Sequence, residues 1–379
     1  MNKPCMRVEG ACASGGLAFT SALESIRAGS DVCLVVGAEV QTTVSARQGG
    51  EYLARASHFK RQKDLDDFVF PALFARRIKH CSEAYGITAD DLAMLSVKAY
   101  KNANKNPLAH MHAVKMDMET ASSKGDKNPA FLANEEYKDF LKISDCSQVS
   151  DGGAALVLVS EEGLAKLGKS MADCTEVIGL GQATGNLYVD ADPLTLGTTA
   201  AAANAAYAEA GVVPADVDVA EVSSGSLIQP SFNPPPTSNS NAPLDVAEVS
   251  RGSLIQPSSN FTSHLTLPLD VAEVHDCFTI TELLMAEALG FAPVGEGKTA
   301  VREGRFEIDG DIPINTGGGL VGFGHPVGAT GVKQLLEVHR QFKGQCGEYQ
   351  VPGSPEVGVC ANMGGDDKTA VVTVLKNCK

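Results

Sequence analysis

A five-residue sequence, DVAEV, occurs three times in this chain, starting at positions 218, 245 and 270. The starts lie 27 and 25 residues apart, a spacing compatible with a solenoid of stacked repeats. The residues between the copies argue against a solenoid, because they are rich in proline, serine and asparagine and offer little to a packed core. We therefore interpret residues 218–269 as a partial duplication that forms a flexible surface loop. We favour the third copy as the buried strand, because it alone continues into a sequence containing His275 and Cys277.

Outside this insert, segments typical of strands and of helices alternate, which indicates an α/β fold with a largely parallel sheet. The apolar run 31–40 predicts a strand that is buried on both faces. The other expected elements are a strand over 5–10, a turn, strand and helix over 150–168, a strand over 175–185, helices over 13–27, 198–211 and 279–290, a strand, glycine-rich turn and helix over 313–342, and a hairpin over 355–376. Glycine-rich turns occupy similar places in the two parts of the chain, so we expect two similar halves.

The charge of the chain limits its partners. The net charge is −15 over 379 residues, which argues against nucleic acid as a ligand. Residues 47–147, however, hold 16 of the 31 basic and 14 of the 46 acidic residues, so this block carries +2 and the remainder −17. A basic block of this kind is suited to an anionic ligand. No apolar run reaches the roughly 18 residues of a membrane-spanning helix, so no membrane span is expected.

The cysteines indicate a reducing compartment. The ten cysteines form no CxxC pair, and the N-terminus has no signal-peptide pattern. We expect reduced thiols and an intracellular protein, with a peroxisome-like organelle, the mitochondrion and the cytoplasm all left open.

Two residues stand out as a nucleophile and its base. Cys12 lies in RVEGACASGG, between an expected strand and helix, where backbone amides and the helix dipole favour a thiolate and can hold an oxyanion. His325 lies in GFGHPVGATG, where small neighbours leave the imidazole accessible, and a base within reach of a cysteine activates it. Taken singly, each is equally compatible with a structural role.

Three further residues lie where expected strands end. His275 and Cys277 are two positions apart in HDCF, so both can face one cavity. Cys360 lies in GVCANMGG at another strand end. Core packing is the alternative interpretation for all three. The cysteines and histidines lack zinc-site spacing, so no metal is expected, and no GxGxxG or P-loop indicates a nucleotide phosphate site.

These stretches together resemble the thiolase superfamily. VEGACASGG resembles its nucleophile loop, HDCF and GHPVGATG resemble its two downstream catalytic motifs, and SDGGAALVLVSEE resembles the strand that closes its first half. The resemblance extends over nearly the whole chain apart from residues 218–269. The HDCF form is similar to the sterol-carrier-protein-2 type, since most thiolases have Asn-Glu-Ala-Phe at this place. The resemblance implies an acyltransferase of fatty-acid and lipid metabolism that cleaves 3-ketoacyl-CoA with CoA, or runs the reverse Claisen condensation.

The resemblance also implies roles for individual residues. Cys12 carries the acyl group, His325 activates it, and His275 holds an oxyanion-hole water. Most thiolases have a second, acid/base cysteine in a Cys-x-Gly triplet, but this chain has Asn-Met-Gly at 362–364. In the HDCF type the acid/base role falls to Cys277, with Cys360 as a reserve candidate. Gly364 supplies a backbone amide to the second oxyanion hole, together with that of Cys12.

The same resemblance implies the domain organisation and the partners. Residues 1–46 are an incomplete N-terminal half, 47–147 a loop domain that covers CoA, 148–168 the end of the N-terminal half, and 169–379 the C-terminal half with the insert 218–269. Acyl-CoA and CoA are substrates, no cofactor is needed, and a homodimer is implied. Candidates for contacts with the CoA phosphates are Lys60, Arg61, Lys63, Arg76 and Arg77.

Two alternatives remain at this stage. A cysteine with two histidines also resembles the decarboxylating ketoacyl synthases. Cys12 further lies close to the start of the chain, whereas a thiolase has two strands and two helices before the strand that leads to its nucleophile. This departure implies exposed sheet edges and favours either a start upstream of Met1 or a catalytically inactive, truncated protein.

Overall fold

The computed structural model describes residues 3–212 and 269–379. The first two copies of DVAEV and almost all of the expected surface loop lie outside these residues. The third copy forms strand β4 (Val271–Val274), in which every residue is buried, so the prediction that this copy is the buried strand is confirmed. No helix among the described residues is long and apolar enough to cross a membrane.

The larger sheet has four strands in the order β3 (Thr175–Thr184), β6 (Thr369–Asn377), β5 (Val357–Gly364) and β4. The pairs β3–β6 and β6–β5 are antiparallel, and only β5–β4 is parallel. The expectation of a largely parallel sheet is therefore wrong, because β5 and β6 form a hairpin and β3 pairs along the outer edge of that hairpin.

The smaller sheet consists of β1 (Val32–Glu39) and β2 (Gly152–Val159), which run antiparallel from the pair Val32–Val159 to the pair Glu39–Gly152. The prediction that β1 is buried on both faces is wrong, because alternate side chains such as Leu34 and Val36 are more than half exposed. No strand forms over residues 5–10, which are mostly exposed.

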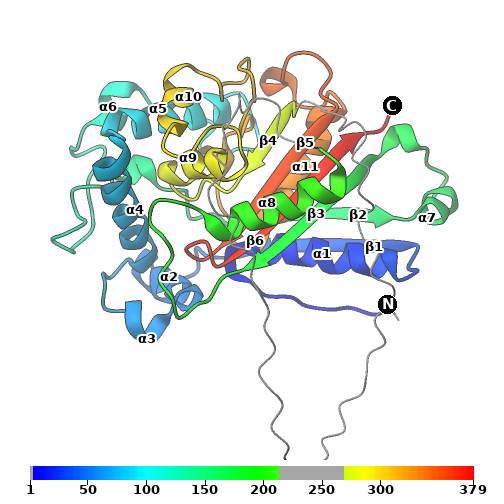
Figure 1. The fold of residues 1–379 in the computed structure, drawn as a ribbon, viewed down its shortest axis with the longest axis horizontal. Coiled ribbons are helices and arrows are strands. Elements are labelled where there is room, and N and C mark those ends of the chain that lie inside the picture. Colours follow the sequence, from blue (N-terminus) through cyan, green and yellow to red (C-terminus); the bar gives the residue numbers. More distant parts are fainter. Residues whose placement is uncertain (1–2, 213–268) are drawn as a thin grey trace, which may run out of the picture. The chain divides into compact units, whose positions relative to one another are not determined.

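Two helices lie between the two sheets. Helices α1 (Ser14–Arg27) and α11 (Thr330–Phe342) pack on one face of the larger sheet, and α8 (Gly197–Ala210) covers the opposite face (Figure 1). Phe19 of α1 and Val332 of α11 share one buried cluster with Val35 of the smaller sheet. The two helices therefore form the middle layer, and their N-terminal turns carry the residues of the candidate site.

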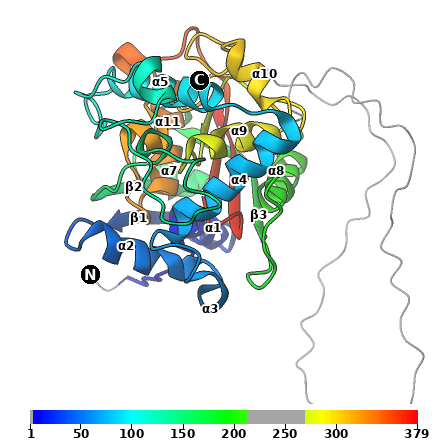
Figure 2. The ribbon, with the colours of Figure 1, turned by 90° about the vertical axis from the view of Figure 1, so that its left-hand side faces the viewer.

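Residues 47–147 contain helices and loops, and their only β-pairing is two isolated bridges, Gly125–Asn128 and Cys146–Phe278. The longer helices are α4 (Val69–Tyr85) and α5 (Ala89–Ala103), and both contact α9 (Thr279–Ala288), which follows the HDCF sequence (Figure 2). The shorter helices of the chain are α2 (Ala46–Leu53), α3 (Phe59–Gln62), α6 (Met118–Ser122), α7 (Glu161–Lys166) and α10 (Gly297–Arg302).

Candidate functional site

Cys12 lies in a strained turn at the entrance to the middle layer. A short 3-10 turn (Ala11–Ala13) leads into α1, and Ala11 has a φ of 52°, which is uncommon for a residue with a side chain. The Ala11 amide donates to Glu9 Oε1 at 2.8 Å, and Ser14 Oγ donates to the Ala11 carbonyl at 2.6 Å. These bonds hold the turn in a conformation that places Cys12 at the N-terminal end of the helix.

The surroundings of Cys12 keep its thiol protonated. Burial is the largest influence and raises the pKa of Cys12 to about 12, with smaller contributions from the charges of Glu39 and Glu9. The backbone amides of Cys12 and Gly365 act in the opposite direction. The resting nucleophile is therefore a thiol, and a base must remove its proton when it attacks.

His325 is the candidate for such a base. Its ring nitrogen Nδ1 lies 2.7 Å from Thr330 Oγ1, and Thr330 Oγ1 donates to the Pro326 carbonyl at 3.1 Å. The other ring nitrogen, Nε2, is buried and has no hydrogen-bond partner among the described residues. Burial lowers the pKa of His325 to about 4, so the ring is neutral at physiological pH.

His275 stands directly after β4 and faces His325. The two rings are arranged edge to face, with centroids 5.1 Å apart. Burial, and then the neighbouring His325, lower the pKa of His275 well below its ordinary value. The Cys12 sulfur and one nitrogen of each histidine lie within 4.8 Å of one another. The fold thus brings together three predicted residues from distant parts of the chain.

The two candidate acid/base cysteines differ in their surroundings. Cys277 is buried, with its sulfur 3.6 Å from Thr281 Oγ1. Burial and then the proximity of Cys12 raise its pKa well above the ordinary value. Cys360 is buried in the cluster between the two sheets, where burial and then Glu273 raise its pKa. The structure thus places Cys277, rather than Cys360, within electrostatic reach of the nucleophile.

Gly364 packs directly against the nucleophile turn. A Cβ atom at this position would overlap the Gly10 carbonyl oxygen and lie 3.0 Å from the Ala13 nitrogen. Any larger residue would push the end of β5 away from Cys12. The amide that acts on the Cys12 thiol belongs to the next residue, Gly365.

Asn362 and Asp276 are polar residues of the site that sequence reasoning did not assign. Asn362 Nδ2 donates to the Cys12 carbonyl at 3.0 Å. Asp276 accepts from the Leu320 amide at 2.6 Å, at the start of the π-helical turn (Gly319–Phe323) that precedes His325. The only signal in the sequence was the position of Asp276 in HDCF and of Asn362 in the Asn-Met-Gly triplet. Neither position reveals the backbone partners of the two side chains.

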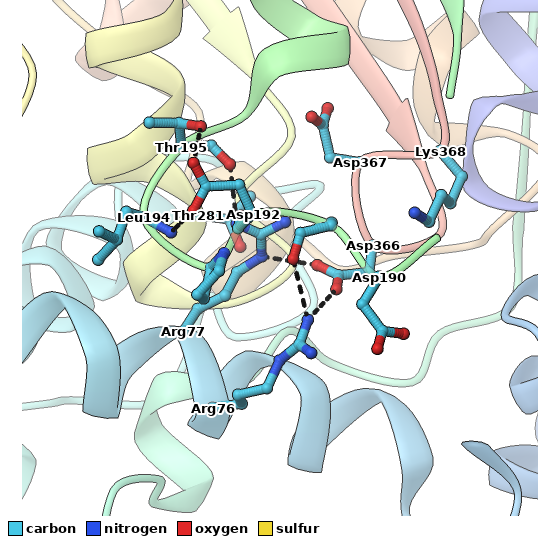
Figure 3. A network of polar contacts seen from close by, with 12 residues as sticks. Arg76, Arg77, Asp190, Asp192, Leu194, Thr195, Thr281, Asp366, Asp367 and Lys368 are labelled. Carbon is cyan, nitrogen blue, oxygen red and sulfur yellow. Dashed lines mark hydrogen bonds and ion pairs between the residues drawn. The ribbon is translucent and has the colours of Figure 1, made fainter. Parts of the chain in front are cut away.

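Arg76 and Arg77 both bind Asp366, in the turn between β5 and β6 (Figure 3). Arg77 is completely buried and also donates to the carbonyls of Asp192 and Thr195. Through these contacts, both arginines stabilise the turn that contains Asp366, next to Gly365. The other three candidates for phosphate contacts, Lys60, Arg61 and Lys63, are exposed on and just after α3.

Comparisons with known proteins show the family of the chain. Residues 1–162 match the model of the thiolase N-terminal domain, and residues 265–377 match that of the thiolase C-terminal domain-like family. The chain is 32% identical over 376 residues to an acetyl-CoA acetyltransferase of Methanothermobacter thermautotrophicus, covering 98% of this chain and 80% of that protein. It is 27% identical over 388 residues to human sterol carrier protein 2, covering 98% of this chain and 58% of that protein.

Among solved structures, the chain is similar in fold to one described as an Ltp2-ChsH2(DUF35) aldolase. The TM-score is 0.68 at 20% identity, over 98% of this chain and 78% of that chain. Fold, site and comparisons define an α/β acyltransferase that carries its acyl group on a cysteine. The chain belongs to the thiolase family, as its motifs predicted.

Proposed function

We propose that the chain is a 3-ketoacyl-CoA thiolase that cleaves its substrate with CoA into acetyl-CoA and a shortened acyl-CoA. The observation that carries the proposal is the convergence of the Cys12 sulfur with one nitrogen each of His275 and His325 within 4.8 Å. The buried Cys277 is the fourth residue of this proposed catalytic set. A nucleophile, a base, an oxyanion donor and a second thiol are the groups that this two-step reaction needs.

In the first step, Cys12 Sγ attacks the 3-keto carbon of the substrate while His325 Nε2 takes the thiol proton. The bond between the α and β carbons then breaks, and its electron pair stays on the acetyl-CoA fragment. The Cys277 thiol protonates that carbon, so acetyl-CoA leaves and Cys12 keeps the shortened acyl group as a thioester. Oxyanion-hole donors stabilise the negative charge that develops on the substrate oxygens.

In the second step, the thiol of free CoA gives its proton to the Cys277 thiolate and attacks the Cys12 thioester. The acyl group passes to CoA, and the Cys12 sulfur leaves with the proton that His325 had taken. Each residue returns to its starting protonation state. The scheme needs no metal or redox cofactor, and its reverse is a Claisen condensation of two acyl-CoA molecules.

CoA binding is proposed for the basic helical region of residues 47–147. Lys60, Arg61 and Lys63 are the exposed members of the predicted set, and Arg61 lies close to Asp190 and stacks on Tyr188. The phosphates of CoA compete with Asp190 for this guanidinium. We assign Arg76 and Arg77 a structural role instead, because both bind Asp366 in the turn between β5 and β6.

We further propose a homodimer and an intracellular location. The outward face of β1 and β2 presents Leu34, Val36 and Val157, each more than half exposed, as an apolar surface for a second copy. All ten cysteines are free, which suits a reducing compartment.

The direct test is thiolysis of acetoacetyl-CoA, followed by mass spectrometry of the protein without added CoA. We expect an acyl group on Cys12, and no activity in the Cys12→Ala variant. A decarboxylating condensing enzyme would require a malonyl substrate, so exchange of labelled acetyl-CoA in its absence separates the two classes. If neither acylation nor exchange occurs in a folded protein, the catalytic proposal is wrong.

A further inference from the structure

We propose that Asn362 is a positioning residue that holds the proton of His275 on Nε2, so that this imidazole is a hydrogen-bond donor in the active site. The role in turnover rests on the proposed function, whereas the position of the proton does not. Asn362 occupies the first place of the triplet where most thiolases have a cysteine.

Two backbone groups determine the orientation of the Asn362 amide. The Gly16 amide of α1 donates to Oδ1 at 3.0 Å, and Nδ2 donates to the Cys12 carbonyl at 3.0 Å. A rotation of the amide by 180° would set a donor against a donor and an acceptor against an acceptor. These two contacts therefore determine which atom of the Asn362 amide is oxygen and which is nitrogen. Neither contact involves a histidine.

This orientation directs Nδ2 to His275 Nδ1, at a distance of 3.4 Å. An amide nitrogen is only a donor, so His275 Nδ1 must accept. Burial keeps the ring neutral, and a neutral imidazole carries one proton. The proton of His275 therefore lies on Nε2.

His325 has the opposite arrangement. The Thr330 hydroxyl has a single hydrogen; with that hydrogen on the Pro326 carbonyl, the hydroxyl oxygen accepts from His325 Nδ1. The free Nε2 of His325 then carries a lone pair. Two histidines with rings 5.1 Å apart are thus set to different tasks, one to accept the Cys12 proton and one to donate to an oxyanion.

The same assignment bears on metal binding. Cys12, His275 and His325 lie close enough for a shared ion, and cysteine and histidine are typical zinc ligands. A nitrogen that carries a proton cannot ligate a metal. With Asn362 in place, His275 Nδ1 already accepts a hydrogen bond and Nε2 carries the proton, so Cys12 and His325 are the two ligands left for an ion.

The test is the Asn362→Asp variant, which keeps the shape of the side chain and the bond from Gly16 but replaces the donor to the Cys12 carbonyl by an oxygen. A carboxylate accepts from His275 Nδ1, so the proton moves to Nδ1 and the oxyanion donor is lost. We expect kcat to fall by about 10²-fold or more, the loss typical of a missing oxyanion-hole donor, with KM little changed. We also expect Zn²⁺ to inhibit this variant and to protect Cys12 from iodoacetamide.

Asn362→Ala is the matched control. It removes more contacts than Asn362→Asp, but it leaves His275 free to keep its proton on Nε2. If Asn362 acts through His275, the aspartate variant loses more kcat than the alanine variant. An alanine variant that loses as much kcat as the aspartate variant, or more, would overturn the proposal.

The tautomer itself is read by ¹⁵N NMR of labelled wild-type protein, which requires no turnover. Protonated Nε2 in His275 and protonated Nδ1 in His325 support the proposal, even if thiolysis is absent and the proposed function fails. Protonated Nδ1 in His275 overturns it at any level of activity. Binding of Zn²⁺ alone to the wild-type protein through Cys12, His275 and His325 would overturn it as well.

Discussion

Gly15 and Gly331 lie against each other where the first turns of α1 and α11 meet. A Cβ atom on Gly15 would lie 2.8 Å from the backbone nitrogen of Gly331, so only glycine allows this approach. The contact sets the distance between the helix that follows Cys12 and the helix that follows His325. Catalytic geometry in this chain therefore depends on helix packing as much as on the catalytic side chains.

Substitution of Gly15 tests that dependence. Gly15→Val forces the two helices apart, so we expect a loss of about 1–3 kcal/mol in the free energy of unfolding, typical of overpacking. We expect thiolysis to fall by a larger factor than this loss explains, because the base moves away from the thiol. Gly29→Val is the control, since a Cβ atom there would meet no other part of the described chain within 4 Å, although its φ of 101° also costs stability. Equal losses of activity in the two variants would contradict the interpretation.

The buried ion pair between Arg77 and Asp366 provides a second prediction. Arg77 Nε lies 2.6 Å from the carboxylate, and both side chains are almost fully buried. Arg77→Ala leaves part of the carboxylate charge without a partner, so we expect a loss of about 3–5 kcal/mol in the free energy of unfolding. Urea denaturation measures this loss. Lys124→Ala breaks an exposed pair with Asp139 and should leave stability nearly unchanged. Similar curves for both variants would show that Arg77 is dispensable.

The raised pKa of Cys12 predicts how the thiol reacts at different pH. With a pKa of about 12, only a small fraction is thiolate at neutral pH. The rate of alkylation of the resting protein should therefore still rise above pH 9, where a free thiol with a pKa of about 8.5 levels off. Iodoacetamide kinetics with mass analysis of the Cys12 peptide measure the profile, and glutathione is the reference. A plateau below pH 8 would instead indicate a preformed thiolate–imidazolium pair.

The lowered pKa of His325 predicts a dependence of stability on pH. The folded protein resists protonation down to a pH of about 4, whereas the unfolded chain takes up the proton below about 6.5. The unfolded state binds more protons between these values, so the free energy of unfolding decreases as the pH falls through that window. His325→Gln should make this decrease shallower. Urea denaturation at pH 7 and pH 5 measures this decrease in the free energy of unfolding. An unchanged decrease in the variant would show that His325 is not its source.

The two candidate acid/base cysteines, both buried, make a matched pair of variants. Cys277→Ala should lower thiolysis by about 10²–10⁴-fold, since it removes the proton donor for the acetyl-CoA carbon. Cys360→Ala removes the same atoms from the core between the sheets and should leave kcat nearly unchanged. Steady-state kinetics with acetoacetyl-CoA compare the two. Loss of activity in Cys360→Ala alone would move the role to the reserve candidate.

Local sequence patterns were sufficient to predict many of the helices and strands and most of the candidate site residues. The helices expected over 13–27 and 198–211 form within one residue of those bounds, and the C-terminal hairpin and the buried third copy of DVAEV also follow from local periodicity, glycine positions and apolar runs. Cys12 and His325 were recognisable because each lies in a short motif of small residues, and His275 and Cys277 because HDCF follows an expected strand. Such features are local, so neighbouring residues encode them.

Tertiary structure decided what depends on partners distant in the sequence. The exposed face of β1, the antiparallel pairings and the burial of Arg77 depend on which segments lie opposite, and periodicity carries no such information. The same holds for Asn362, whose amide is oriented by residues about 350 positions away. Each candidate catalytic residue was identified from local sequence, but its protonation state is set by burial and by hydrogen bonds that only the folded chain provides.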